Sequence, residues 1–261
     1  MTDSRGSGWI PPGAATLGPT PPPGRDCNGD GPRLPIDEVT IVHALAKRAM
    51  EGEPTITTRI QAVADRQSIA LVGLGQRIKQ FDSLAQKMVT LRAEGSTVPE
   101  ALDKINDIVR YRLVIPDHRY SAAVETVANR LQGQGQYLYS DWNAWASGRY
   151  KGINLTWQTE DRVKFEIQFH TERSYYACTA THDAYKQMKS PTRGQIDRRS
   201  DQAEIARAFS RVPDPDGVEG IHLPESIVGA KRREEREDHG SAGPDHRRWK
   251  KWPGRAGGQE R

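Results

Sequence analysis

The chain has 261 residues, of which 35% are hydrophobic and 28% are charged, with a mean hydropathy of −0.76. This length allows one domain with tails or two small domains, and the low hydrophobic fraction indicates that part of the chain stays outside a core. The sequence contains no run of about 18 apolar residues, and its first residues lack a basic segment followed by an apolar stretch, so we expect neither a membrane span nor a secretory signal. Its two cysteines do not make a disulfide framework, which favours a reducing, cytoplasmic location.

The net charge of +4 is concentrated at the C-terminus. Residues 231–261 contain ten Lys or Arg and six Asp or Glu, so the rest of the chain is neutral overall. Basic residues alternate there with tryptophan: Arg247, Arg248, Trp249, Lys250, Lys251 and Trp252. Such a pattern suits RNA by stacking plus charge. We therefore predict a disordered Pro/Gly-rich tail over 1–35, one domain over 36–212 and a basic flexible tail over 213–261.

Hydrophobic periodicity and turn residues define the elements of the domain. In chain order we predict helices at 36–49 and 54–66, a strand at 71–79, helices at 82–92 and 98–105, a strand at 106–115, a helix at 120–132, strands at 136–142, 150–158 and 162–170, and helices at 172–189 and 197–211. Pro54 is expected to begin the second helix, and Ser83 with Gln86 fits a capping box. Strands alternating with helices predict an α/β or α+β fold with a mixed sheet.

The strands at 150–158 and 162–170 have one polar and one apolar face. Residues 164, 166, 168 and 170 are polar, and those between them are apolar. If both apolar faces point the same way, a three-residue loop at 159–161 sets three cross-strand pairs: Asn154 with Glu166, Gly152 with Gln168 and Tyr150 with His170. Alternation alone is more typical of a solvated outer face than of a binding site.

A second group of polar residues suits a triphosphate. Arg77 and Lys79 share a face of the predicted strand, and Ser83 and Lys87 share a face of the following helix, whose N-terminus attracts anions. Asp107, at the start of a later strand, could hold Mg²⁺ against the phosphates. Scattered surface charge is the alternative interpretation.

Taken in order, these segments resemble the RelA/SpoT-type (p)ppGpp synthetases over about residues 40–190. Residues 77–87 resemble the family's R-x-K-x-x-x-S-x-x-x-K motif, residues 107–112 its D-I-I-G-x-R strand, residues 149–154 its G-Y-x-S-x-H segment and residues 166–171 its E-[IV]-Q-[IL]-R-T strand. A further match falls on the family's A-x-H-x-x-Y-K helix, with His182, Tyr185 and Lys186.

The resemblance implies a small, synthetase-only protein with a nucleotidyltransferase-like fold. It implies that ATP donates pyrophosphate to the 3′-hydroxyl of GTP or GDP in the presence of Mg²⁺, giving (p)ppGpp. The ATP phosphates would be bound by these residues: Arg77, Lys79, Ser83, Lys87 and Arg112. Asp107 and Glu166 would hold the metal, and Glu166 would assist it or deprotonate the acceptor hydroxyl. Tyr150 would stack on the guanine, and the acceptor side would be completed by Asn154, Gln168 and His170.

The chain departs from the family pattern mainly on the acceptor side. The departing residues are Arg110, Arg149, Asn154 and His170. Two alternatives therefore stay open: a toxin-like relative that modifies an adenosine nucleotide or the 3′ end of tRNA, reached through the basic tail, and a catalytically inactive nucleotide- or RNA-binding module. Assembly as a homo-oligomer, or with a neutralising antitoxin, is also left open.

Overall fold

The computed structural model describes residues 34–147, 149–189 and 194–231. The predicted tail at 1–35, apart from its last two residues, and residues 232–261 lie outside the described residues. The described chain divides into two compact units: residues up to 48 together with 79–105, and residues 49–78 together with those from 106 onward. No helix of the described chain is long and apolar enough to cross a membrane.

One long helix, α1 (Ile36–Arg66), replaces the two helices predicted at 36–49 and 54–66. The prediction that Pro54 begins a new helix is wrong. A proline inside a helix removes one backbone hydrogen bond, but the apolar stripe continues across it at helical spacing. Its buried members are Val42, Ala46, Ala49, Ile56, Ile60 and Val63. Continuous burial of this stripe offsets the lost bond.

The first unit contains two short helices besides the beginning of α1, namely α2 (Phe81–Ala93) and α3 (Val98–Lys104). Helix α3 begins with a capping box between Thr97 and Glu100. The capping box predicted at Ser83 is absent, because α2 already begins at Phe81, whose ring stacks on His43 at 3.9 Å. Ser83 is therefore an exposed residue of the first turn.

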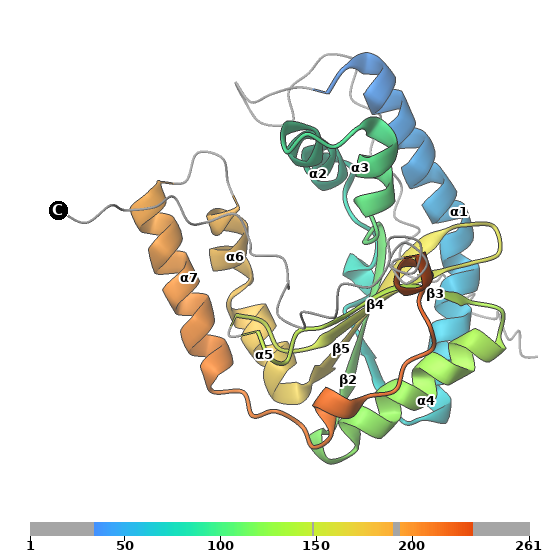
Figure 1. Ribbon diagram of the computed structural model, residues 1–261, viewed down its shortest axis with the longest axis vertical. Coiled ribbons are helices and arrows are strands. Elements are labelled where there is room, and N and C mark those ends of the chain that lie inside the picture. Colours follow the sequence, from blue (N-terminus) through green and yellow to red (C-terminus); the bar gives the residue numbers. More distant parts are fainter. Residues whose placement is uncertain (1–33, 148, 190–193, 232–261) are drawn as a thin grey trace, which may run out of the picture. The chain divides into compact units, whose positions relative to one another are not determined.

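A five-stranded mixed sheet forms the centre of the second unit (Figure 1). Its strands are β1 (Ala70–Val72), β2 (Val109–Ile115), β3 (Tyr137–Asn143), β4 (Ile153–Gln158) and β5 (Lys164–Thr171). They lie in the order β1-β2-β5-β4-β3; β2 and β5 are parallel, and the other three pairs are antiparallel. With flanking helices, this sheet confirms the predicted α+β class.

The strand predicted at 71–79 stops after Val72. Gly73 adopts a left-handed conformation (φ 69°), which ends the strand and starts a short 3-10 helix, Leu74–Gln76. Arg77 follows this turn with helical dihedral angles, so Arg77 and Lys79 do not share the face of a regular strand. Ile78 alone returns to the sheet, in an isolated bridge with Val109.

The β4–β5 hairpin has the predicted faces but a different register. Asn154 pairs with Gln168, and Thr156 pairs with Glu166. The predicted pairing is wrong by two residues because Arg162 adopts a left-handed conformation (φ 59°), which centres the loop on 160–162 instead of 159–161. A shift of two keeps every side chain on its predicted face.

Helices cover both sides of this sheet (Figure 1). Helix α4 (Tyr120–Gly133) lies on one side, and α5 (Glu172–Ala180), α6 (His182–Met188) and α7 (Gln195–Ser210) lie on the other. The single helix predicted at 172–189 is interrupted at Thr181, whose hydroxyl bonds to the Ala177 carbonyl while its backbone leaves the helical region.

The chain beyond α7 stays in contact with the second unit. The carbonyl of Asp216 accepts a hydrogen bond from Ser121, and that of Val218 accepts one from Asn143. Val218 is 3% exposed. The first part of the predicted tail, 213–222, is therefore fixed against α4 and β3.

Candidate active site

One face of the sheet carries two adjacent rows of mainly polar residues across four strands. The first row is Trp142 (β3), Asn154 (β4), Gln168 (β5) and Arg112 (β2). The second is Ser140 (β3), Thr156 (β4), Glu166 (β5) and Arg110 (β2). Neighbouring strands are about 4.8 Å apart. The structure thus brings four of the predicted site residues side by side: Arg112, Asn154, Glu166 and Gln168.

This face is rich in cationic groups around one carboxylate. Glu166 accepts a hydrogen bond from Gln168 at 2.7 Å and lies opposite Arg110 in the parallel register. The Arg110 Nε atom is buried without a hydrogen-bond partner. Burial, and then the charge of Arg110, lower the pKa of Arg112. A buried donor and two arginines in adjacent rows are the features expected of an anion-binding site.

His170 lies at the covered end of the same face and is fully buried. Burial, followed by the charges of Arg112 and Arg110, lowers its pKa to about 3. Its Nδ1 lies 3.2 Å from the Ser174 hydroxyl, and its Nε2 lies 3.4 Å from the Tyr150 hydroxyl. His170 is therefore neutral at physiological pH and joins α5 to the loop before β4.

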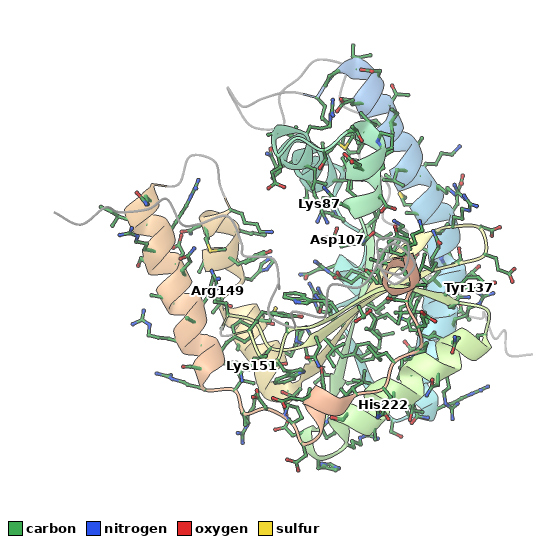
Figure 2. All side chains as sticks on the ribbon, viewed as in Figure 1. Lys87, Asp107, Tyr137, Arg149, Lys151 and His222 are labelled. Carbon is green, nitrogen blue, oxygen red and sulfur yellow. The ribbon has the colours of Figure 1, made fainter. Side chains whose placement is uncertain are left out.

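Tyr150 lies in the loop before β4, not in the strand as predicted. Its chain neighbours Arg149 and Lys151 are labelled in Figure 2. Its hydroxyl donates to Asn154 Oδ1 at 2.8 Å, and its ring stacks on Trp142 with a centroid distance of 5.4 Å and an interplanar angle of 12°. The ring also contacts Phe209 of α7 at 5.8 Å. Tyr150, the predicted acceptor-side tyrosine, is thus held in place by contacts from β3 and from α7.

Arg77 is engaged within the protein. Its Nε donates to Glu53 Oε1 at 2.5 Å, its Nη2 donates to Oε2 at 3.3 Å, and its Nη1 donates to the Leu74 carbonyl at 2.8 Å. Thr57 also donates to Glu53, and its hydroxyl lies 2.7 Å from that of Tyr111. The hydrogen bond that Arg77 donates to the Glu53 carboxylate raises the pKa of Arg77. The Glu53 carboxylate therefore occupies the edge of the Arg77 guanidinium to which a phosphate would otherwise bind.

Three of the other predicted phosphate-binding residues belong to the first unit, whereas Arg112 lies on β2 of the second unit. Lys79 precedes α2, and Ser83 and Lys87 lie four apart on α2, beside the buried residues Leu84 and Met88. Ser83 and Lys87 therefore share one helix face, as predicted. Lys87 is labelled in Figure 2.

The residues predicted to hold Mg²⁺ are two carboxylates of the second unit. Asp107 lies two residues before β2, at its N-terminal end (Figure 2), and Val109 pairs with Phe165, the neighbour of Glu166. Among the described residues, no group of three or more His, Cys, Asp or Glu side chains could hold a metal ion. Because Mg²⁺ is commonly bound by one or two carboxylates plus substrate phosphates, this donor set fits a metal that arrives with ATP.

Sequence reasoning assigned no site role to Glu53 or to Trp142. Glu53 falls on the apolar stripe of α1, between Ala49 and Ile56, and a charged residue on a buried stripe signals a buried partner. Trp142 alternates into the polar face of β3 and is 44% exposed, a signal that the strand pattern contained.

No protein-family model matches the chain, and no curated protein matches it. Its structure is similar to that of small alarmone synthetase 1 from Bacillus subtilis, at 16% identity and a TM-score of 0.45, covering 78% of this chain and 98% of the other. It is similar to a GTP pyrophosphokinase family protein from Streptococcus pneumoniae, at 16% identity and a TM-score of 0.45, covering 79% and 96%. It is also similar to the Type VI effector Tas1, solved with its immunity protein, at 16% identity and a TM-score of 0.40, covering 66% and 97%. With TM-scores below 0.5, a function must be argued from the residues of the site.

Proposed function

We propose that this chain is a cytoplasmic pyrophosphokinase that transfers pyrophosphate from ATP to the 3′-hydroxyl of GTP or GDP. The observation that carries this proposal is the juxtaposition of Glu166 with Arg110 and Arg112 on one sheet face, in a chain that also contains the R-x-K-x-x-x-S-x-x-x-K pattern of the family it resembles. Phosphoryl-type transfer needs charge neutralisation and positioning more than covalent help.

The reaction would proceed by attack of the acceptor oxygen on the β-phosphorus of ATP. The new bond joins that oxygen to the β-phosphorus, the bond to the α,β-bridging oxygen breaks, and AMP leaves with the electron pair. Glu166 would accept the hydroxyl proton or hold the metal, and Asp107 would be the other metal ligand. Mg²⁺, when bound, would neutralise the phosphate charge.

On the donor side, Lys79, Ser83 and Lys87 would bind the ATP phosphates. Arg77 would join them on release from Glu53, and Arg112 would support the same phosphates. On the acceptor side, the site would consist of Tyr150, Asn154, Gln168 and His170. Tyr150 contacts both Asn154 and His170, and Gln168 lies opposite Asn154 in the sheet, which supports this grouping.

The test is transfer of label from ATP carrying ³²P at the γ-phosphate, with GDP, GTP, ADP and tRNA offered separately. We expect labelled product from GDP or GTP and a requirement for Mg²⁺. The absence of labelled product with every acceptor would contradict the proposal and support the inactive module.

The second candidate is modification of the 3′ end of tRNA, which the basic C-terminal segment favours. Full-length chain and a chain ending at Gly229 should be compared at two salt concentrations. If tRNA were the acceptor, its labelling would fall steeply with salt, because each phosphate contact releases counterions, and it would fall on truncation. If GDP or GTP is the acceptor, truncation should leave turnover nearly unchanged.

A further inference from the structure

Trp142 is the exposed aromatic residue of the polar sheet face. It pairs with Asn154 across β3 and β4, and 44% of its surface is exposed. One side of its ring stacks on Tyr150. Tyr150 is already contacted by Trp142, His170 and Phe209 and hydrogen-bonded to Asn154. Of these two stacked rings, Trp142 is therefore the one with surface to offer a ligand.

The register places this ring at a defined position relative to the charged groups. Trp142 and Arg112 stand at the two ends of one row of four strands, and at about 4.8 Å per strand their Cα atoms are about 14 Å apart. Glu166 belongs to the adjacent row and lies on β5, a strand between those of Trp142 and Arg112. It is about 7 Å along β5 from Gln168, which belongs to the row of Trp142 and Arg112. An aromatic ring, a carboxylate and a guanidinium thus follow one another across the face, in the order of the base, the sugar hydroxyl and the 5′-phosphates of one nucleotide.

We propose that Trp142 is the stacking platform for the acceptor base and that Arg110 binds the acceptor's 5′-phosphates. This inference rests on the proposed function, which supplies a nucleotide acceptor, and it names the residues that position it. Tyr150 becomes a positioning residue, which holds the Trp142 ring through the stack and is itself fixed by Asn154.

Two observations support the assignment of Arg110. Its Nε is a buried donor without a hydrogen-bond partner, so an incoming anion would satisfy it. Its position opposite Glu166 on β2 also sets it three strands away from Trp142, at the end of the face assigned to the phosphates. Stacking on Trp142 tolerates any base, because every base presents a π face.

The test is equilibrium dialysis with a saturating non-hydrolysable ATP analogue, using ADP, GDP, CDP and UDP as probes together with the nucleoside of the diphosphate that binds most tightly. Trp142→Ala should weaken binding of that diphosphate and of its nucleoside about 5- to 150-fold, the range for loss of one base stack. Arg110→Ala should weaken the diphosphate and leave the nucleoside unchanged, because only the former carries phosphate.

Two further variants separate stacking from folding. Trp142→Phe, which keeps an aromatic face, should retain binding, whereas Trp142→Leu, which keeps apolar contact with Tyr150, should lose it. Tyr137→Ala is the matched control, since Tyr137 is also on β3, on the same face as Trp142, and is 50% exposed (Figure 2). Its partner on β4 is Gln158, four residues beyond Asn154, the partner of Trp142. Tyr137→Ala should bind like the wild type.

Wild-type affinity in Trp142→Ala or Trp142→Leu, or no binding of any diphosphate by the wild type, would overturn the inference. Equal loss of diphosphate and nucleoside in Arg110→Ala would overturn the phosphate assignment. Because dialysis measures binding alone, Trp142-dependent binding without transfer would contradict the proposed function and leave this inference standing.

Discussion

Replacing Glu53 by alanine should destabilise the second unit, because it leaves a partly buried arginine without its acceptor. The Glu53 side chain is 6% exposed and takes hydrogen bonds from two guanidinium nitrogens of Arg77 and from Thr57. Removing one partner of a buried ion pair costs about 3–5 kcal/mol. Since the Arg77 side chain is 26% exposed, water recovers part of this loss, and we expect about 2–4 kcal/mol. At roughly 2–4 °C per kcal/mol, the melting temperature should fall by about 4–16 °C.

Thermal unfolding followed by circular dichroism measures this loss. Glu204→Ala, an exposed glutamate on α7, is the matched control and should change the stability by less than about 0.5 kcal/mol. The double variant Glu53→Ala/Arg77→Met should recover part of the loss, because it removes the uncompensated charge. A melting temperature of Glu53→Ala within 2 °C of the wild type would refute this reasoning.

Three other changes test the site and the sheet. Glu166→Gln should abolish pyrophosphate transfer while ATP still binds, as measured by labelled transfer and by dialysis; near-wild-type turnover would remove Glu166 from the catalytic group. Gly152→Ala should cost about 1–3 kcal/mol in urea unfolding, because a Cβ atom would lie 2.9 Å from the Phe169 carbonyl, whereas Gly75→Ala, with nothing within 4 Å, should cost little. The lowered pKa of His170, about 3 against about 6.5 in the unfolded chain, means that the unfolded chain binds the extra proton between these values. The free energy of unfolding should therefore fall as the pH drops from 6.5 toward 3, and that of His170→Gln should fall less over the same range. Equal slopes of the unfolding free energy against pH for the two proteins would contradict a buried neutral imidazole.

Much of the local structure follows from the sequence pattern. The alternation along 162–170 correctly assigned Glu166 and Gln168 to one face, because side chains in a strand point alternately to its two sides. It did not fix which residues are opposite each other. That register depends on the loop, where Arg162 adopts a left-handed conformation that residues other than glycine seldom take.

Local signals were misleading where packing outweighed them. Pro54 suggests a helix start, yet the buried stripe on both sides of it keeps α1 continuous. The short apolar run from Leu71 predicts a long strand, yet Gly73 turns the chain after three residues of β1. In α1 the tertiary burial of the stripe outweighs a proline cost of about 3 kcal/mol. At Gly73 one backbone conformation outweighs a strand propensity of about 1 kcal/mol.

The sequence by itself determined the alternation of elements, the polar face of the hairpin and the residue types available for binding phosphate. Only the tertiary structure decided that Arg110 and Arg112 stand beside Glu166 and Gln168, because β2 and β5 are far apart in the chain and pair in parallel. Only the tertiary structure paired Glu53 with Arg77 as well. Periodicity is a property of neighbouring residues along the chain, whereas strand order and ion pairing are set by which distant segments bury their apolar surface together.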